Sequence, residues 1–291
     1  MPDQPPETTG AAPGEANRPD ASSEGGARRP SGFWMQTGRA PKDGAQASVP
    51  ARRTAPRPDA RPGRWRRLTL RLLLWMMAGA VGFAALSAAA VFVIGWTGPP
   101  PTLNMAIAAS GGADVRRTWA PLTRISPHLI RAVIAAEDQR FCAHQGFDAV
   151  EIQKALDEAE RGRRLRGAST LSQQTAKNVF LWNGGGFVRK GFEAWFTLLV
   201  EQMWSKPRII EIYLNVAEWG EGAYGAEAAA RLHFNKPASR LTQREAALLA
   251  AVLPSPNRWS VDGRYAQRRA GQIQTLMRVI RRDGLDACVI R

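Results

Sequence analysis

The stretch from Leu72 to Trp96, LLLWMMAGAVGFAALSAAAVFVIGW, contains no charged residue. An α-helix rises ~1.5 Å per residue, so ~20 apolar residues already cross the hydrocarbon core of a bilayer, and this run is longer. Trp75 and Trp96 lie near its ends, as is typical of tryptophan at a membrane interface. Because Arg66-Arg67 precedes the run, a cleaved export signal is the alternative, but the apolar core of such a signal has only ~7–15 residues. We predict a retained transmembrane helix over 72–96.

The segment before this helix is basic and rich in proline. Residues 1–71 hold 13 Arg and Lys against 7 Asp and Glu, and 11 of the 20 prolines lie in residues 1–63. Such a segment cannot bury enough surface to offset its chain entropy, so we predict a disordered tail. Contact of its arginines with anionic lipid or nucleic acid is the alternative to a solvated tail. Because arginines crowd the N-terminal side of the apolar run, we expect the tail in the cytoplasm and the remaining chain across the membrane.

The residues after the membrane helix are predicted to form one mainly α domain over 102–291. Gly98 and the prolines at 99–101 end the membrane helix. Start signals such as Ser126-Pro127, capping boxes and apolar periodicity then recur, and alternating strand patterns are nearly absent. The expected helices cover about 126–137, 148–160, 170–181, 187–204, 205–215, 242–254 and 265–282.

The whole chain carries 40 Lys and Arg against 25 Asp and Glu, a formal net charge of +15. This charge favours an acidic partner, such as nucleic acid, anionic lipid or a phosphorylated substrate. The 2 cysteines and 3 histidines exclude a disulfide-rich scaffold and make a histidine-rich metal centre improbable. Cys142 and Cys288 are expected on the oxidising side of the membrane, where a bridge can form, but we expect unpaired, buried thiols.

Glu137 is the first candidate catalytic residue. It ends the helix that starts at Ser126 and shares a face with Ile130 and Ile134, so we expect a partly desolvated carboxylate with a raised pKa. The C-terminal end of its helix dipole acts in the same direction. These features suit a general base or acid, and the alternative is a solvated carboxylate at a helix end.

Two further segments bring polar and cationic side chains together. The first segment is a polar helical face made of Thr170, Gln173, Gln174 and Lys177. This face begins at a helix N-terminus, which itself favours anions. Arg189 and Lys190 precede Glu193 by four and three residues, so all three can lie on one side of a helix. They form either a phosphate site or a surface ion-pair cluster, and exposed ion pairs stabilise a protein little.

Four motifs occur in order along this domain. They are E-D-x-x-F-x-x-H-x-G at 137–146, G-x-S-T-x-x-Q-Q-x-x-K-N at 167–178, R-K-x-x-E at 189–193 and K-x-x-I-x-E-x-Y-L-N at 206–215. Together they resemble the peptidoglycan glycosyltransferases of family 51, over about residues 120–260. Ala168 stands where a glycine is common, and Cys142 is unusual within the first motif. No S-x-x-K motif follows, so the resemblance is to the monofunctional members, which lack a transpeptidase domain.

The resemblance implies a lysozyme-like, mainly α-helical glycosyltransferase domain and an enzyme that polymerises lipid II. In that reaction the 4-hydroxyl of the acceptor N-acetylglucosamine attacks the anomeric carbon of the donor N-acetylmuramic acid with inversion, and undecaprenyl pyrophosphate leaves. Glu137 matches the base of the family, and Glu193 matches a second carboxylate that assists the leaving group directly or through a metal. The residues that match substrate-binding positions are Asp138, Phe141, His144, Ser169, Thr170, Gln173, Gln174, Lys177, Asn178, Arg189 and Lys190; the last two and Lys177 match cations that face the pyrophosphates.

The resemblance also sets the expected surroundings of the enzyme. No cofactor is required, and a divalent cation (Mg²⁺ or Mn²⁺) is compatible although no strict set of ligands is present. The expected partners are lipid II, the growing glycan chain, the membrane and proteins of the division or elongation machinery (the divisome), with no nucleic acid. We expect a single-pass protein of the cell inner membrane, with its N-terminus in the cytoplasm and its catalytic domain in the periplasm, acting in cell wall synthesis and cell shape.

Three other classes of protein remain as alternatives. A lysozyme-like hydrolase or lytic transglycosylase can share the fold and a catalytic glutamate, but it has no pyrophosphate for Lys177, Arg189 and Lys190 to bind. A non-catalytic membrane scaffold does not need four polar motifs. A nucleic-acid binder is disfavoured because the basic domain is expected outside the cytoplasm.

Overall fold

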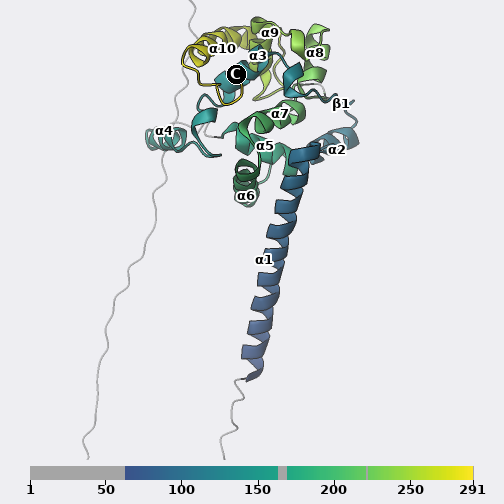
Figure 1. The fold of residues 1–291 in the computed structure, drawn as a ribbon, viewed down its shortest axis with the longest axis vertical. Coiled ribbons are helices and arrows are strands. Elements are labelled where there is room, and N and C mark those ends of the chain that lie inside the picture. Colours follow the sequence, from purple (N-terminus) through teal and green to yellow (C-terminus); the bar gives the residue numbers. More distant parts are fainter. Residues whose placement is uncertain (1–62, 163–168, 221, 291) are drawn as a thin grey trace, which may run out of the picture. The chain divides into compact units, whose positions relative to one another are not determined.

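The computed structural model of the chain describes residues 63–162, 169–220 and 222–290 (Figure 1). The predicted tail therefore lies outside the described residues up to position 62, as does Ala168 of the second motif. The helices are α1 (Gly63–Thr97), α2 (Leu103–Ser110), α3 (Pro127–Glu137), α4 (Ala149–Glu160), α5 (Leu171–Phe180), α6 (Phe187–Met203), α7 (Lys206–Val216), α8 (Ala226–Phe234), α9 (Gln243–Val252) and α10 (Arg264–Arg282). Three short 3₁₀ turns, Leu122–Arg124, Phe141–Ala143 and Ala238–Arg240, and two strands, β1 (Arg116–Arg117) and β2 (Ala223–Tyr224), complete the described elements.

The fold is mainly α, as the sequence predicts, and its helices begin at the predicted signals. Ser126 caps α3 and Thr170 caps α5, each through its side-chain oxygen. The strands pair in parallel over two residues only, with Arg116 opposite Ala223. The sequence did not predict α2 and α8. Both are short, and α8 consists largely of small alanines that give no apolar periodicity.

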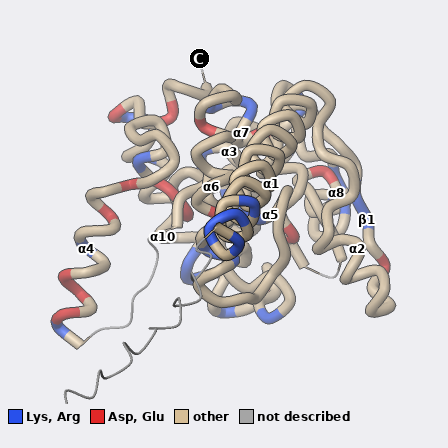
Figure 2. Tube along the Cα trace, turned by 90° about the horizontal axis from the view of Figure 1, so that it is seen from below, with Lys and Arg blue, Asp and Glu red and all other residues tan. Residues whose placement is uncertain are grey.

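The first helix is longer than the predicted membrane span. It begins at Gly63 instead of Leu72, so the arginines before the apolar run lie on its first turns, where Figure 2 shows blue segments at the near end of α1. Among the described residues, α1 is the one helix long and apolar enough to cross a membrane. The chain therefore fits a single-pass membrane protein.

The later part of α1 packs against α6 and the start of α7. The indole of Trp195 donates a hydrogen bond to Ser87 Oγ (3.0 Å), and that of Trp204 donates to the carbonyl of Val91 (2.9 Å). Gly95 makes this approach feasible, because a Cβ there would lie 2.5 Å from Trp204 Nε1. Hydrogen bonds from two indoles to the anchor show that the membrane helix has a defined docking site on the domain.

The core of the domain is built around α7 and around the pair α3 and α9. Ile209, Ile210, Ile212 and Leu214 of α7 are all fully buried, which is typical of a helix covered on every side. The face of α9 that packs on α3 is rich in alanine, so the two helices can approach closely. This packing places the C-terminal end of α3 next to α5, where the candidate site lies.

Candidate active site

Glu137 is the last residue of α3 and is half-buried next to α5. The side-chain NH₂ of Gln174 donates a hydrogen bond to Glu137 Oε2 (2.9 Å), and the hydroxyl of Tyr213 is 3.2 Å from Gln174 Oε1 and donates to it. Burial raises the pKa of the Glu137 carboxyl, against the opposing effects of the Gln174 hydrogen bond and of the positive charges on Arg269 and Lys177. The carboxylate is thus oriented by an amide and kept partly dry, which suits a general base.

Asp138 and His144 hold the loop that follows α3 against α5. His144 Nε2 lies 3.0 Å from both carboxylate oxygens of Asp138, and Asp138 Oδ2 accepts a hydrogen bond from the backbone NH of Leu171 (2.9 Å). The other ring nitrogen of His144 accepts from the backbone NH of Gly146 (3.2 Å). Both side chains are buried and engaged with the protein, so the structure gives them a positioning role, and their predicted contact with substrate stays a prediction.

The N-terminal residues of α5 are also engaged in local structure. Thr170 and Gln173 form the predicted capping box, in which each side chain accepts a hydrogen bond from the backbone NH of the other. Thr170 also donates to the carbonyl of Gly146 (2.6 Å), and both side chains are buried. The structure gives both side chains a capping role, and their part in substrate binding stays a prediction. Gln174, one residue further on, is the member of this face that reaches Glu137.

The structure brings the cations of the second and third motifs together around Glu193. This carboxylate is only 3% exposed, and Arg189 Nη1 donates to its Oε2 (2.7 Å) while the ammonium of Lys190 pairs with its Oε1. Lys190 also donates to Ser169 Oγ (3.2 Å). Lys177 of α5 experiences the charges of the same cluster: burial lowers its pKa, Glu193 raises it, and Arg189 and Lys190 lower it.

Two cations pair with one buried carboxylate and Lys177 adds a third positive charge within range of it, which leaves the cluster positive. The Nε–H of Arg189 is buried and has no hydrogen-bond partner among the described residues. A buried, unpaired donor costs free energy unless a ligand satisfies it. An anion at this position would accept from Arg189 and interact with both lysines, so the cluster suits a phosphate better than a surface ion-pair network.

The remaining two predicted residues differ in placement. Asn178 follows Lys177 on α5 and is half-buried. Phe141 is fully buried in the core, with the ammonium of Lys206 4.5 Å from the centroid of its ring. Phe141 is therefore a core residue in this structure, and its part in substrate binding stays a prediction.

A cleft of about 630 Å³ opens beside Glu137. It is bounded by the loop after α3, the start of α4, Ser169 and Thr170, and the turn at Gly284 and Leu285 after α10. Arg140 and Lys154 of its wall are paired with the carboxylates of Asp148 and Glu151, which also line it. The cleft is large enough for a substrate fragment and lies directly against the candidate base.

A disulfide between Cys142 and Cys288 closes one side of this cleft. The prediction of unpaired thiols is wrong. The two cysteines are 146 residues apart in the sequence, and only the packing of the C-terminal segment beside the loop after α3 brings their Cα atoms to 5.6 Å. The same segment is held by Arg131, whose guanidinium contacts the carboxylate of Asp286 at 2.7 Å.

Comparison with known proteins identifies the family. Residues 104–279 match the transglycosylase family model. The chain is 53% identical over 223 residues to the biosynthetic peptidoglycan transglycosylase of Rhodospirillum centenum, which covers 76% of this chain and 96% of the relative. It is 49% identical over 226 residues to the protein of the same name from Caulobacter vibrioides, covering 77% and 96%. This chain belongs to the transglycosylase family.

The match to the transglycosylase family covers all four sequence motifs and the residues that the structure adds to them. Tyr213, which fixes Gln174, stands in the fourth motif, but its contact depends on the packing of α7 against α5 and has no local signal. Arg269 lies on α10 outside the motifs, and its charge lowers the pKa of Glu137. A basic residue in an amphipathic helix is ordinarily solvated, so the sequence offered no reason to select Arg269.

The residues of the site decide whether this transglycosylase can hold a divalent cation. Both oxygens of Glu193 are already paired with Arg189 and Lys190, so this carboxylate does not fit a metal ligand in the arrangement described. Among the described residues, one group of three has donor atoms close enough to share an ion, and it consists of Asp138, His144 and Asp148. His144 and Asp138 bond to each other, and Asp148 Oδ1 caps α4. Asp148 Oδ2 has no hydrogen bond to a described residue and lies 3.1 Å from the guanidinium Nε of Arg140. The positive charge of Arg140 next to this oxygen disfavours a cation there. No catalytic step is therefore assigned to a metal.

Proposed function

We propose that this peptidoglycan glycosyltransferase joins lipid II units into β-1,4-linked glycan strands at the membrane surface. The observation that carries the proposal is the combination of a desolvated carboxylate, Glu137, with a buried cationic cluster that has a donor to spare at Arg189. Lys177 experiences the charges of both Glu137 and Glu193, so base and cluster belong to one site. A base and an anion site together suit a transfer reaction in which a pyrophosphate departs.

Glu137 acts in this proposal as the general base. The 4-hydroxyl of the acceptor sugar gives its proton to the Glu137 carboxylate as its oxygen attacks the anomeric carbon of the donor. The bond from that carbon to the pyrophosphate oxygen breaks, its electron pair leaves with the pyrophosphate, and the configuration inverts. A base is most effective when its pKa lies near the working pH, and burial moves the pKa of Glu137 in that direction.

The cationic cluster acts on the leaving group. Arg189 presents an unpaired Nε–H, and its planar guanidinium can hold a phosphate with parallel hydrogen bonds. Lys177 and Lys190 add charge at the same place. Because pyrophosphate is stabilised by fixed positive charge, the site needs no strong acid at the leaving oxygen. Glu193 serves in this arrangement to hold Arg189 and Lys190 in position.

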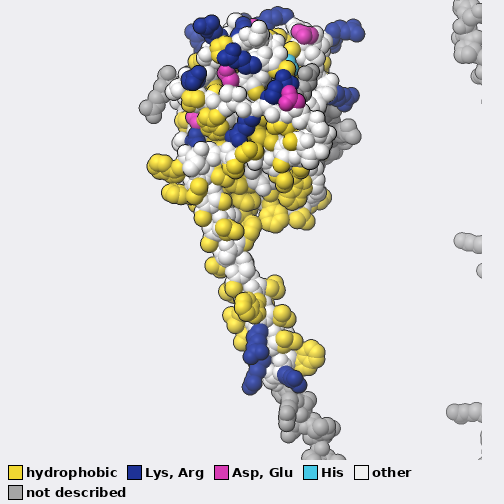
Figure 3. All heavy atoms as spheres, turned by 90° about the vertical axis from the view of Figure 1, so that its right-hand side faces the viewer, with side chains coloured by type: hydrophobic (Ala, Val, Ile, Leu, Met, Phe, Trp, Pro, Cys, Tyr) yellow, Lys and Arg dark blue, Asp and Glu magenta, His cyan; other side chains and the backbone are white. Residues whose placement is uncertain are grey.

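Features of α1 and α6 support a proposed location for the enzyme. We infer that residues N-terminal to α1 lie in the cytoplasm, because arginines occupy the first turns of α1, and that the domain lies in the periplasm at the inner membrane. The disulfide agrees with an oxidising compartment. Hydrophobic side chains gather on the part of the domain next to α1 (Figure 3), where α6 exposes Phe187 and Val188. This surface suits contact with lipid.

Incubation of the full-length protein with labelled lipid II in liposomes tests the proposal. We expect long glycan that lysozyme digests, and a loss of at least ~10² in rate for Glu137→Gln, the usual contribution of a general base. Glu158→Gln, which changes an exposed carboxylate on α4, is the matched control and should retain the rate. Near-normal polymerisation by folded Glu137→Gln would contradict the assignment of the base. Release of short fragments from added peptidoglycan would indicate a cleaving enzyme instead.

A further inference from the structure

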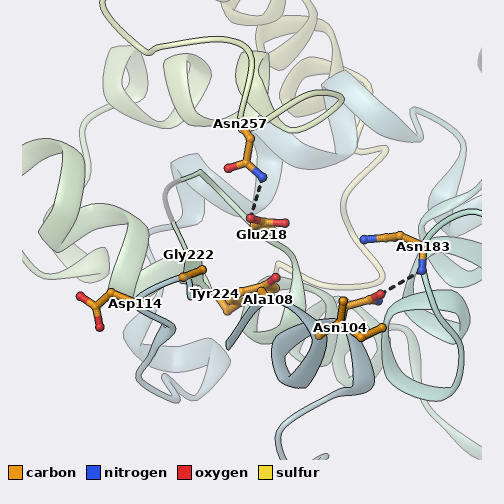
Figure 4. A pocket seen from close by; sticks show the side chains of 10 residues that line it. Asn104, Ala108, Asp114, Asn183, Glu218, Gly222, Tyr224 and Asn257 are labelled. Atoms are coloured by element: carbon orange, nitrogen blue, oxygen red, sulfur yellow. Dashed lines mark hydrogen bonds between the residues drawn. The ribbon is translucent and has the colours of Figure 1, made fainter. Parts of the chain in front are cut away.

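A second cavity, of about 530 Å³, lies between α2, the loop after α5, the turn after α7 and the turn after α9. It shares no lining residue with the cleft beside Glu137. Its wall carries the amides of Asn104, Asn183 and Asn257, the carboxylate of Glu218 and an apolar patch at Ile107 and Ala108 (Figure 4). None of the four motifs explains these side chains.

The polar groups of this cavity are held in defined orientations. Asn257 donates a hydrogen bond to Glu218 Oε1 (2.8 Å), and Asn104 Oδ1 accepts from the backbone NH of Asn183 (2.9 Å). The side-chain amide of Asn183 points into the cavity toward Glu218 (Figure 4). Tyr224 forms part of the floor, and burial together with the neighbouring Glu218 raises the pKa of its hydroxyl to about 12. The hydroxyl therefore stays neutral and protonated.

The charge of the cavity selects a class of ligand. None of its ten lining residues is Lys or Arg, so it does not suit a phosphate or pyrophosphate. Of its two acidic residues, Asp114 points away from the interior (Figure 4), and Glu218 already accepts from Asn257. What remains is a set of neutral amides beside an apolar patch. Such a set matches the hydroxyl and N-acetyl groups of a saccharide, whose methyl and C–H groups can contact Ile107 and Ala108.

The cavity is also connected to the reactive centre through two helices. Gln174 lies on α5 and Tyr213 on α7, and the loops that follow these helices supply Asn183 and Glu218 to the cavity. Asn183 is nine residues beyond Gln174, which places it within roughly 20 Å of the partner of Glu137. A short oligosaccharide spans such a distance.

We propose that this cavity is a saccharide-binding subsite that holds sugars of the growing glycan strand away from the reacting bond. The inference rests on the proposed function, because the strand is the product of that reaction. Holding sugars remote from the pyrophosphate keeps the strand bound between additions. The subsite therefore supports the addition of many units in one binding event and contributes no catalytic group.

The test compares Asn183→Ala with Gln153→Ala in the full-length protein. The Asn183 side chain is exposed and makes no contact that the fold needs, and Gln153→Ala removes an exposed amide on α4 outside both cavities. We expect Asn183→Ala to couple two lipid II molecules at nearly the parent rate but to make shorter glycan. A soluble N-acetylglucosamine oligomer, titrated by calorimetry, should bind Asn183→Ala roughly three- to tenfold more weakly, as for one lost hydrogen bond.

The two readouts separate the possible failures. Unchanged glycan length and unchanged oligomer affinity in Asn183→Ala would overturn the subsite, even if lipid II is polymerised normally. Binding of a free stem peptide instead of the oligomer, lost in Asn183→Ala, would also overturn it. A parent protein that binds the oligomer through Asn183 but makes no glycan would support the saccharide site and contradict the proposed function.

Discussion

The disulfide between Cys142 and Cys288 makes the stability of the domain depend on the redox state. It joins the 3₁₀ turn Phe141–Ala143, in the loop after α3, to the segment that follows α10, across 146 residues of chain. Reduction, or replacement of both cysteines by serine, removes this constraint without removing a group that the proposed chemistry uses. We therefore expect a large effect on stability.

The size of the effect follows from the length of the closed loop. In the chain-entropy account, a cross-link spanning 146 residues disfavours the unfolded chain by about 5 kcal/mol at 25 °C. This value is the upper end of the range found for native disulfides. For a domain of this size, each kcal/mol moves the melting temperature by roughly 2–4 °C. The expected decrease is therefore roughly 10–20 °C.

Near-UV circular dichroism of the full-length protein in detergent measures this decrease, because it reports the tertiary packing of the domain's buried aromatic side chains. The parent should melt at a lower temperature when reductant is present, and the Cys142→Ser, Cys288→Ser double variant should melt at that lower temperature with or without reductant. Melting temperatures for the oxidised and reduced parent that agree within experimental error would refute the reasoning. The double variant has no disulfide to reduce, so an equal melting temperature with and without reductant controls for effects of the reductant itself.

Three further outcomes are expected. Because burial raises the pKa of Glu137, the folded state binds its proton more tightly than the unfolded state does, so this group's contribution to stability falls as pH rises between the ordinary carboxyl value and the raised one. Glu137→Gln should therefore melt at a higher temperature than the parent at neutral pH, and a lower melting temperature would contradict the burial of this carboxylate. The polymerisation rate of the parent should fall as acid protonates the base. Arg189→Lys keeps the charge but loses the Nε–H and the planar guanidinium. It should lower kcat/KM on lipid II by about tenfold, as expected for the loss of one charged hydrogen bond. Kinetics equal to those of the parent would place the pyrophosphate elsewhere. Gly95→Ala brings a methyl group against Trp204 and should reduce the polymerisation rate in liposomes. Gly79→Ala is the control, because its methyl group meets nothing within 4 Å, and it should keep the rate of the parent. Equal rates for the two variants would show that docking of α1 does not matter.

The parts of the fold that depend on local chemistry could be predicted from the sequence. The caps at Ser126, Thr170 and Thr242 use side chains within three residues of the backbone groups they bind, so the starts of α3, α5 and α9 agree with the structure. At Asp148 the cap is present, but Glu151 pairs with Lys154 instead of completing a capping box. An exposed side chain there has a choice of partners that spacing alone does not decide.

The site was predicted less completely because burial is a property of the whole fold. Glu137, Lys177 and Arg189 come from three helices, and their proximity depends on the packing of α5 against α6 and on the bonds that join the end of α3 to α5. Thr170 illustrates another limit: its motif makes it a candidate for substrate binding, but spacing alone does not show that its hydroxyl donates to the carbonyl of Gly146. A motif identifies which residues matter together, and only the structure separates those that support the site from those that face it.

The docking of α1 on α6 has a consequence for how the enzyme meets its substrate. An anchor joined to the domain by indole hydrogen bonds at Val91 and Ser87 fixes the height and tilt of the cleft relative to the bilayer plane. A lipid-linked substrate carries its pyrophosphate at one depth, just outside the hydrocarbon. Enzyme and substrate then differ only in their lateral positions and in rotation about the membrane normal. An encounter between them becomes a search in two dimensions, and collisions at the wrong depth do not occur.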